Sequence, residues 1–394
     1  MKILSVNAGS SSLKFTLFEM DNEEVLISGL FERIGISDGH YVIKYNGEKI
    51  EDYVDLKDHT VAVNILLEKL LELKVINSLD EIDGVGHRVA QGGAIYKETV
   101  MITDEVVENL LALAPLAPLH NPAHVLGINA FKKVLPNTPM TVVFDTAFHQ
   151  TIAPENYIYP VPYEWYLKYQ IRRYGFHGTS HRYITDTISE VMGRKDLRII
   201  SCHLGNGGSI AAIKDGKCID TTMGLTPLAG IVMGSRCGDI DPSIIPYIMK
   251  KENLTIDEVW DILNKKSGLL GVSGVSSDCR DVEKGAAEGN ERCQLALDLF
   301  TDSVIRYIAE YYVELGGCDV ICFTAGIGEN GIATRKRIVD HLGALGAYID
   351  EEKNNVRGKL QELSTDDSKV KVYLVPTNEE LMIARDTLEL ISKK

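Results

Sequence analysis

The sequence predicts an α/β protein made of two similar domains. Apolar runs of strand type alternate with helix-type spacings, and 394 residues are enough for two domains of ordinary size. A short apolar run that enters a glycine- and serine-rich loop occurs twice, at residues 3–12 and 199–209, about half a chain apart. This repeat indicates an internal duplication, although two unrelated turns after strands give the same pattern.

The composition argues against several classes of protein. The chain carries 41 Lys and Arg against 56 Asp and Glu, a net charge of −15, which argues against nucleic acid or an anionic membrane as a partner. No run of about 18 apolar residues occurs and the first residues lack a secretory signal pattern, so we expect a cytoplasmic protein. The seven cysteines include no CxxC pair, which predicts free thiols rather than disulfides or a zinc site.

Hydrophobic spacing predicts the main elements of each half. The first half begins as an antiparallel meander rather than as repeated strand–helix–strand units. Strands are expected at residues 3–6, 14–19, 25–31, 41–45, 141–144, 199–202, 319–323 and 371–375. Helices are expected at residues 59–73, 181–192 and 291–315. Another is expected to follow the loop at residues 116–122 and to end near residue 134, and a last one to begin after residue 376.

Two glycine-rich stretches predict nucleotide binding. Residues 205–209, Gly-Asn-Gly-Gly-Ser, follow a buried strand, and backbone N–H groups of glycines approach an anion closely, which predicts a phosphate cradle. Residues 324–331 have the bare G-x-G-x-x-G spacing, but a dinucleotide fingerprint normally opens its domain, so adenosine is the better interpretation. The polar turn at residues 277–280 either contacts a nucleotide or leads into a helix.

Three cations stand out by their surroundings in the sequence. Lys14 follows the first loop, where it either neutralises phosphate or lies on an exposed strand. Arg88 lies at a strand end among glycines, where it either forks onto a carboxylate or phosphate or forms a structural salt bridge. Arg236 lies in the turn-rich residues 223–242, a long loop of the kind that is usually functional.

Acidic and histidine side chains complete the candidates. Asp145 ends a strand, a placement typical of catalytic carboxylates and equally of turn or capping residues. His177 lies on a glycine loop before a helix, where it either donates to a phosphoryl group or has a structural role. Glu379 either complements a helix dipole or reaches Mg²⁺ through water, and Thr377 with Glu380 has the spacing of a capping box.

Nine segments, in order between Lys2 and Glu380, resemble the acetokinase family of the acetate and sugar kinase, heat-shock protein 70 and actin superfamily. They read NAGSSSLKF, HRVAQGG, PLHNP, FDTAFH, GFHGTSH, HLGNGGS, MGSRCGDIDP, FTAGIGEN and TNEE. The resemblance implies an α/β, duplicated two-domain ribonuclease H-like (actin-like ATPase) fold with a central cleft. We expect an N-terminal domain of residues 1–149 plus 381–394, and a C-terminal domain of residues 150–380 that holds the nucleotide site.

The resemblance also implies a reaction. Its members transfer a phosphoryl group reversibly between ATP and acetate, giving acetyl phosphate and ADP, with Mg²⁺, for which Mn²⁺ substitutes, in a homodimer. At matching positions Asn7 and Glu379 would place the metal, while Arg88 and Arg236 would clamp the substrate and the moving phosphoryl group. The residues implied to hold ATP are Lys14, His203, Leu204, Gly205, Asn206, Gly207, Asp278, Cys279, Arg280, Gly326, Ile327, Gly328, Glu329 and Asn330.

Two further roles follow from the same resemblance. His177 would stabilise the transition state, and Asp145 is the acid/base of the family. A carboxylate substrate is already ionised at pH 7 and needs no base, so we expect Asp145 to orient an arginine or metal-bound water instead.

The predicted acyl pocket departs from the family pattern. Its wall is implied to contain Ala90, Leu119, Phe176 and Pro227, and Ala90 stands where the family has valine, beside Gln91 in place of histidine. A wider pocket favours a longer acid, since one methylene is worth about 1–3 kcal/mol, so a propionate kinase is the alternative. A non-catalytic ATP-binding module is more remote, because it would lack the set of Arg88, His177 and Arg236.

Overall fold

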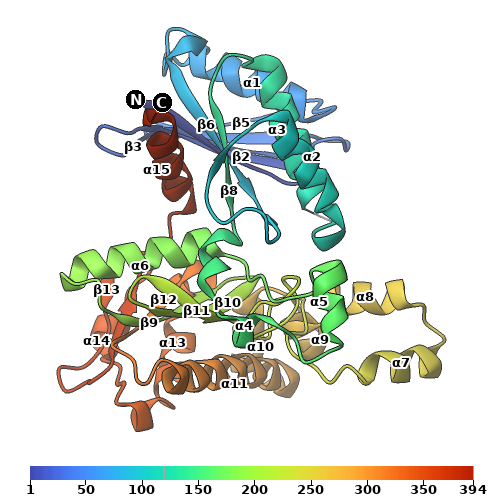
Figure 1. Ribbon diagram of the computed structural model, residues 1–394. Coiled ribbons are helices and arrows are strands. Elements are labelled where there is room, and N and C mark those ends of the chain that lie inside the picture. The colour runs from blue at the N-terminus through green and yellow to red at the C-terminus, as the bar shows by residue number, and fades with distance from the viewer. Residues whose placement is uncertain (119, 394) are drawn as a thin grey trace. The chain divides into compact units, whose positions relative to one another are not determined.

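The protein is described by a computed structural model that covers residues 1–118 and 120–393 (Figure 1). Leu119 lies outside these described residues. The chain divides into two compact units, residues 1–148 with 378–394 and residues 149–377, and each unit contains one mixed sheet. No helix of the described residues is long and apolar enough to cross a membrane.

The first unit contains an eight-stranded sheet. In spatial order its strands are β5 (Glu48–Tyr53), β4 (His40–Tyr45), β3 (Glu24–Glu32), β2 (Ser12–Glu19), β1 (Lys2–Ala8), β6 (Ile82–Val89), β8 (Met140–Phe144) and β7 (Val100–Met101). Strands β1 to β5 form the predicted antiparallel meander, whereas β6 pairs parallel with β1, and β8 with β6. The parallel strands therefore end at one edge of the sheet, near Asn7, Arg88 and Asp145.

Helices cover both faces of this sheet. On one face Thr141 of β8 is hydrogen-bonded to Thr387 of α15 (Glu379–Ser392), at 2.7 Å between the two oxygens. On the other face His87 of β6 meets Phe131 of α3 (Asn121–Val134), which packs against α1 (His59–Glu72). A fully buried apolar side chain such as that of Phe131 stabilises the fold by about 1.5–3 kcal/mol. The unit also contains α2 (Asp104–Ala112) and the 3₁₀ helices η1 (Leu79–Glu81) and η2 (Ala114–Leu116).

The second unit contains a six-stranded sheet. Its strands, in spatial order, are β11 (Lys217–Thr221), β10 (Gly208–Lys214), β9 (Arg198–Leu204), β12 (Val320–Thr324), β14 (Lys371–Leu374) and β13 (Gln361–Glu362). Its main helices lie on opposite sides of the sheet in Figure 1, and they are α6 (Gly178–Met192) and α11 (Glu291–Glu314).

Shorter helices complete the second unit. They are α4 (Pro154–Tyr157), α5 (Tyr163–Tyr169), α7 (Ile244–Glu252), α8 (Ile256–Lys265), α9 (Gly268–Ser273), α10 (Cys279–Ala287), α12 (Ala325–Asn330), α13 (Ile332–Val339), α14 (Glu351–Asn354) and η4 (Gly343–Leu345). The 3₁₀ helix η3 (Ala147–Thr151) contains the boundary between the two units. Helix α12 begins directly after β12, so part of the glycine-rich stretch at residues 324–331 is helical.

The two sheets share one arrangement of five strands. The order β3-β2-β1-β6-β8 in the first unit matches β11-β10-β9-β12-β14 in the second, with two antiparallel pairs followed by two parallel ones. The duplication predicted from the sequence is therefore confirmed. The alternative, two unrelated turns after strands, is wrong.

Strand β9 alternates between two different environments. Cys202 and Leu204 belong to the apolar core that includes Phe300 of α11. On the opposite face Ser201 and His203 are hydrogen-bonded to side chains of α6. A strand alternates its side chains between two faces, so β9 separates an apolar layer from a buried polar one.

Candidate active site

A cavity of about 550 Å³ lies beside the loop that follows β9, in the second unit. Its volume is within the range of small-molecule sites. The predicted nucleotide-binding residues that line it are Gly205, Asn206, Asp278, Cys279, Arg280, Gly326, Ile327 and Asn330. Among the described residues, the other predicted ones do not line it: Lys14, His203, Leu204, Gly207, Gly328 and Glu329.

The cavity also contains residues that sequence reasoning missed, among them Glu283 and Arg357. Arg357 Nε donates to the carbonyl oxygen of Asn330 at 3.1 Å. Its segment is held by the fully buried Arg335, whose guanidinium donates to the carbonyls of Gly328 and Val356. No local motif marks Arg357, because it reaches the cavity only through this tertiary contact.

Arg236 lies against the glycine loop at residues 205–209. Its Nη1 is 3.1 Å from where a Cβ on Gly207 would be, so a side chain at this position would press on the guanidinium. The backbone N–H of Gly234 donates to the carbonyl oxygen of Asn206 at 2.9 Å, which ties the arginine loop to the glycine loop. The structure thus brings together two stretches that are far apart in the sequence.

The surroundings of the Arg236 charge differ from those of the other candidate arginine. Nη1 donates to the carbonyl oxygen of Pro227 at 3.2 Å, and no carboxylate in residues 1–118 or 120–393 forms an ion pair with the guanidinium. Burial lowers the pKa of Arg236 below its ordinary value. A half-buried cation without a counterion favours binding of an anion.

His177 also lies next to this loop. It precedes α6 with a left-handed backbone (φ 56°), which is uncommon outside glycine. Its ring stacks on that of His203, with centroids 4.1 Å apart and planes inclined by 19°. Its Nδ1 is 2.9 Å from Oγ of Ser209 in β10. His203, predicted to hold ATP, is therefore in direct contact with His177.

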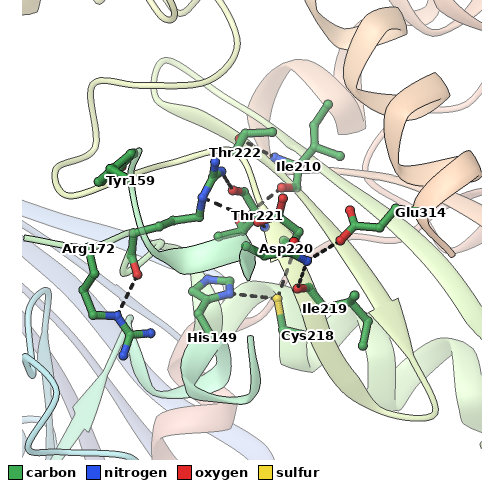
Figure 2. Close-up of polar contacts among 12 residues, drawn as sticks. His149, Tyr159, Arg172, Ile210, Cys218, Ile219, Asp220, Thr221, Thr222 and Glu314 are labelled. Carbon is green, nitrogen blue, oxygen red and sulfur yellow. Dashed lines mark hydrogen bonds and ion pairs between the residues drawn. The ribbon is translucent and has the colours of Figure 1, made fainter. Parts of the chain in front are cut away.

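A buried polar network supports the turn that carries His177 (Figure 2). One ring nitrogen of His149 is 2.8 Å from the carbonyl oxygen of Phe176, and the other is 3.1 Å from Sγ of Cys218, toward which the ring points. Asp220 lies beside Cys218, 3.5 Å from Nε of Arg173. Burial outweighs this arginine and raises the pKa of Asp220 to about 7.

In the first unit Arg88 is enclosed by carboxylates. Its Nε donates to Oδ1 of Asp145 at 3.0 Å and its Nη2 to Oδ2 at 2.6 Å, a bidentate pair, and Oε2 of Glu379 is 3.9 Å away. Asp145 is almost fully buried. Burial disfavours the charged guanidinium, but Asp145 and Glu379 outweigh it and raise the pKa of Arg88. Of the two interpretations of Arg88, the salt bridge is therefore present, and it occupies a candidate site.

Two more acids and a lysine surround this pair. Burial, together with Asp145 and Glu380, raises the pKa of Glu379 to about 7 despite Arg88 and Lys14. Lys14 forms an ion pair with Glu380 and lies opposite Asn7 in the β1–β2 register. The carboxylates outnumber the cations in this group, so the acidic cluster of Asp145, Glu379 and Glu380 has room for additional positive charge.

The predicted acyl-pocket residues are divided between the units. Ala90 is buried in the first unit, next to Gln91, whose Oε1 accepts from the backbone N–H of Gly93 at 2.9 Å. Phe176 and Pro227 belong to the second unit. The prediction for Leu119 lies outside the described residues.

The duplicated sheets and the loop after β9 define a protein of the actin-like ATPase fold. A crystal structure of acetate kinase from Porphyromonas gingivalis is 43% identical and has a TM-score of 0.95, with 99% of each chain covered. One of a propionate kinase from Francisella tularensis is 40% identical and has a TM-score of 0.94, with 98% of this chain and 99% of that chain covered.

Sequence comparison identifies the family within that fold. The acetokinase family matches residues 2–385. Acetate kinase of Bacillus subtilis is 55% identical over 391 residues, which cover 99% of both chains. The chain belongs to the acetokinase family.

Proposed function

We propose that the protein is an ATP:acetate phosphotransferase, which forms acetyl phosphate and ADP reversibly. The observation that carries the proposal is Arg236, a cation that forms no ion pair with a carboxylate of the described residues and lies against the glycine loop beside His177. The relatives named acetate kinase, which are similar over nearly the whole chain, support acetate as the acceptor.

The reaction needs alignment and charge neutralisation. An oxygen of the acetate carboxylate attacks the γ-phosphorus of ATP, the bond to the β–γ bridging oxygen breaks, and ADP leaves with that electron pair. Charge spreads over the three equatorial oxygens in the transition state, and fixed donors there are more effective than water. Arg236 and His177 supply such donors, and the cavity beside the glycine loop accommodates the nucleoside.

Asp145 acts as a positioning residue in this proposal. Its two oxygens accept from Nε and Nη2 of the Arg88 guanidinium, so the hydrogens of Nη1 and the second hydrogen of Nη2 remain for the substrate. Acetate is ionised at pH 7, so the attack releases no proton and needs no base. Arg88, held in this way, orients the substrate carboxylate.

The acidic cluster of the first unit, with Asn7 nearby, suits a magnesium ion. Mg²⁺ prefers hard oxygen ligands and usually takes one or two from the protein, with phosphate and water completing the set. Glu379 and Asn7 offer such oxygens, and the raised pKa of Glu379 reflects a site that needs more positive charge. In the described part of the chain no cluster of three or more His, Cys, Asp or Glu forms a closed metal site. Bound there, Mg²⁺, or Mn²⁺ in its place, would neutralise phosphate charge.

The proposal includes a homodimer in the cytoplasm. The second unit exposes large apolar side chains on α5, α7 and α8, which are Tyr163, Trp165, Leu167, Tyr169, Ile244, Tyr247, Ile256 and Trp260. Exposed apolar surface of this kind is typical of protein interfaces. All seven cysteines are free thiols, as a reducing compartment favours. Light scattering of the wild type and of Tyr247→Glu tests the dimer, since the variant is expected to dissociate.

A propionate kinase is the second candidate, because Ala90 is smaller than the valine of the family pattern. Ala90→Val is expected to lower kcat/KM for propionate about tenfold relative to acetate, since one methylene is worth about 1–3 kcal/mol. An unchanged ratio would show that Ala90 does not set the chain length.

The experiment that tests the function is formation of acyl phosphate from ATP, trapped as the hydroxamate, with acetate, propionate and butyrate. Turnover is expected with acetate in the presence of Mg²⁺. ATP binding without turnover of any of the three acids would favour a non-catalytic ATP-binding module and contradict the proposal.

A further inference from the structure

A chain of buried hydrogen bonds leads from the sheet of the second unit to His177. Oγ of Ser201 in β9 is 2.9 Å from Nδ1 of His181, and Nε2 of His181 is 2.8 Å from Oγ of Ser209 in β10. Oγ of Ser209 is in turn 2.9 Å from Nδ1 of His177. Ser201, His181 and Ser209 are fully buried, so within the chain each group depends on its neighbour.

The direction of these hydrogen bonds follows from counting donors. Burial lowers the pKa of His181 well below its ordinary value, so its ring is neutral and has one donor and one acceptor nitrogen. Within the described residues Ser201 Oγ has one hydrogen-bond partner, Nδ1 of His181. If this hydroxyl accepted, its own hydrogen would be buried without a partner, which is unfavourable by about 1–3 kcal/mol. Ser201 therefore donates to His181.

The directions of the remaining hydrogen bonds are then determined. His181 Nδ1 accepts, so its Nε2 carries the proton and donates to Ser209. Within the described residues the hydrogen-bond partners of Ser209 Oγ are Nε2 of His181, from which it accepts, and Nδ1 of His177. The hydroxyl hydrogen would be buried without a partner unless it were directed to Nδ1 of His177, so Ser209 donates to His177. A histidine nitrogen that accepts a hydrogen bond carries no proton in the neutral ring, so the proton of His177 is on Nε2.

We propose that Ser209, oriented by His181, is a positioning residue that holds His177 as the Nε2–H tautomer, so that the neutral ring donates to the phosphoryl group in transfer. The inference rests on the proposed function and deepens it. The ring keeps its proton throughout, because it donates a hydrogen bond and no proton is transferred. The stack on His203 and the left-handed backbone fix the ring plane, and Ser209 fixes its protonation.

The first test replaces Ser209 by alanine. Without the hydroxyl, Nδ1 of His177 has lost its donor and the two tautomers compete. We expect kcat to fall about 10–100-fold, the range found when a partner that orients a functional histidine is removed, with KM for ATP and acetate within about twofold. Unchanged kcat would overturn the proposal.

Two controls separate positioning from a structural role. Thr185→Val removes another buried hydroxyl on α6, which donates to the backbone carbonyl of His181 and not to a ring, and kcat is expected to stay within about twofold. In a His177→Gln background Ser209→Ala is expected to change kcat less than about twofold, since its effect passes through His177. A second large loss in that background would contradict the proposal.

A spectroscopic measurement needs neither turnover nor a Ser209 variant. In ¹⁵N-histidine-labelled protein at about pH 8.5, the signal absent from His177→Gln identifies His177 among the 10 histidines. Nitrogen shifts of an Nε2–H tautomer are expected, and those of Nδ1–H would overturn the inference. If the wild type forms no acyl phosphate, the proposed function fails, while the tautomer is still measured.

Discussion

Arg88 and Arg236 occupy opposite electrostatic environments. Arg88 is forked onto Asp145 and lies 3.9 Å from Glu379, so its charge is balanced by acids of the first unit. Arg236 lies in the second unit beside Gly207, and its guanidinium donates to the backbone carbonyl of Pro227 and to Sδ of Met233. The difference teaches that two arginines expected to act as one clamp have different local partners. In the proposed reaction Arg236 would supply net positive charge, whereas Arg88 would supply a fork of fixed direction.

The largest expected effect is that of Arg236→Met. The substitution removes the uncompensated charge beside the glycine loop. We expect kcat to fall at least about 10³-fold, the order found for arginines that stabilise phosphoryl transfer. Acyl phosphate formation measures it. The control is Arg306→Met, which removes an exposed arginine paired with Asp302 and is expected to leave kcat within about twofold. A loss below tenfold for Arg236→Met would break the comparison.

Asp145→Asn tests the other arginine. The amide cannot accept both forks, so Arg88 loses its direction, and we expect kcat/KM for acetate to fall about 100-fold, mainly through KM. The matched control is Asp319→Asn, which alters a comparable bidentate pair with Arg198 and is expected to leave KM for acetate unchanged. A fall in kcat alone that hydroxide restores at high pH would instead indicate that Asp145 is a base.

The raised pKa of Glu379 predicts that the stability of the fold depends on pH. The pKa of Glu379 is raised from 4.5 to about 7 in the folded protein, so between these values the folded state binds more protons than the unfolded one. Stability is therefore expected to fall as pH rises from 4.5 to 7, by about 1–3 kcal/mol, and Glu379→Gln to flatten this slope. Thermal unfolding without divalent ions checks it. A slope that is identical in the variant contradicts the assignment.

The smallest expected effect concerns Lys14 and Glu380. Their ion pair is partly exposed, with 53% of the lysine side chain accessible. Such pairs contribute about 0–1 kcal/mol, so Glu380→Gln is expected to change unfolding by less than about 1 kcal/mol. A loss of several kcal/mol in the free energy of unfolding would show that this exposed pair contributes as much to stability as the buried pair of Arg88 and Asp145.

Local patterns predicted the duplicated sheets and most of the loops around the cavity, because strand periodicity and glycine loops are written in contiguous residues. Side-chain direction could not be predicted in the same way. Ser209 belongs to the predicted cradle, yet its hydroxyl contacts His177 and His181. The prediction that Thr377 and Glu380 form a capping box was wrong, because the side chain of Asn378 caps α15 and the hydroxyl of Thr377 is hydrogen-bonded to that of Ser180.

The same limit explains the arginines. Neighbouring glycines and turn residues mark both arginines, but only the fold shows that Asp145 approaches Arg88 across 57 positions of sequence and that no acid within the described residues forms an ion pair with Arg236. Counterions come from tertiary packing. Their presence or absence is therefore invisible to a single-sequence argument.

The most direct test of the central claim is to compare Arg88→Lys with Arg236→Lys, measuring acyl phosphate formation with acetate and ATP. Lysine keeps the charge and loses the fork. If Arg236 acts through net charge, Arg236→Lys retains at least about a tenth of wild-type kcat, while Arg88→Lys loses most of kcat/KM for acetate because Asp145 no longer directs a fork. The reverse order, with Arg88→Lys the more active variant, would contradict the account.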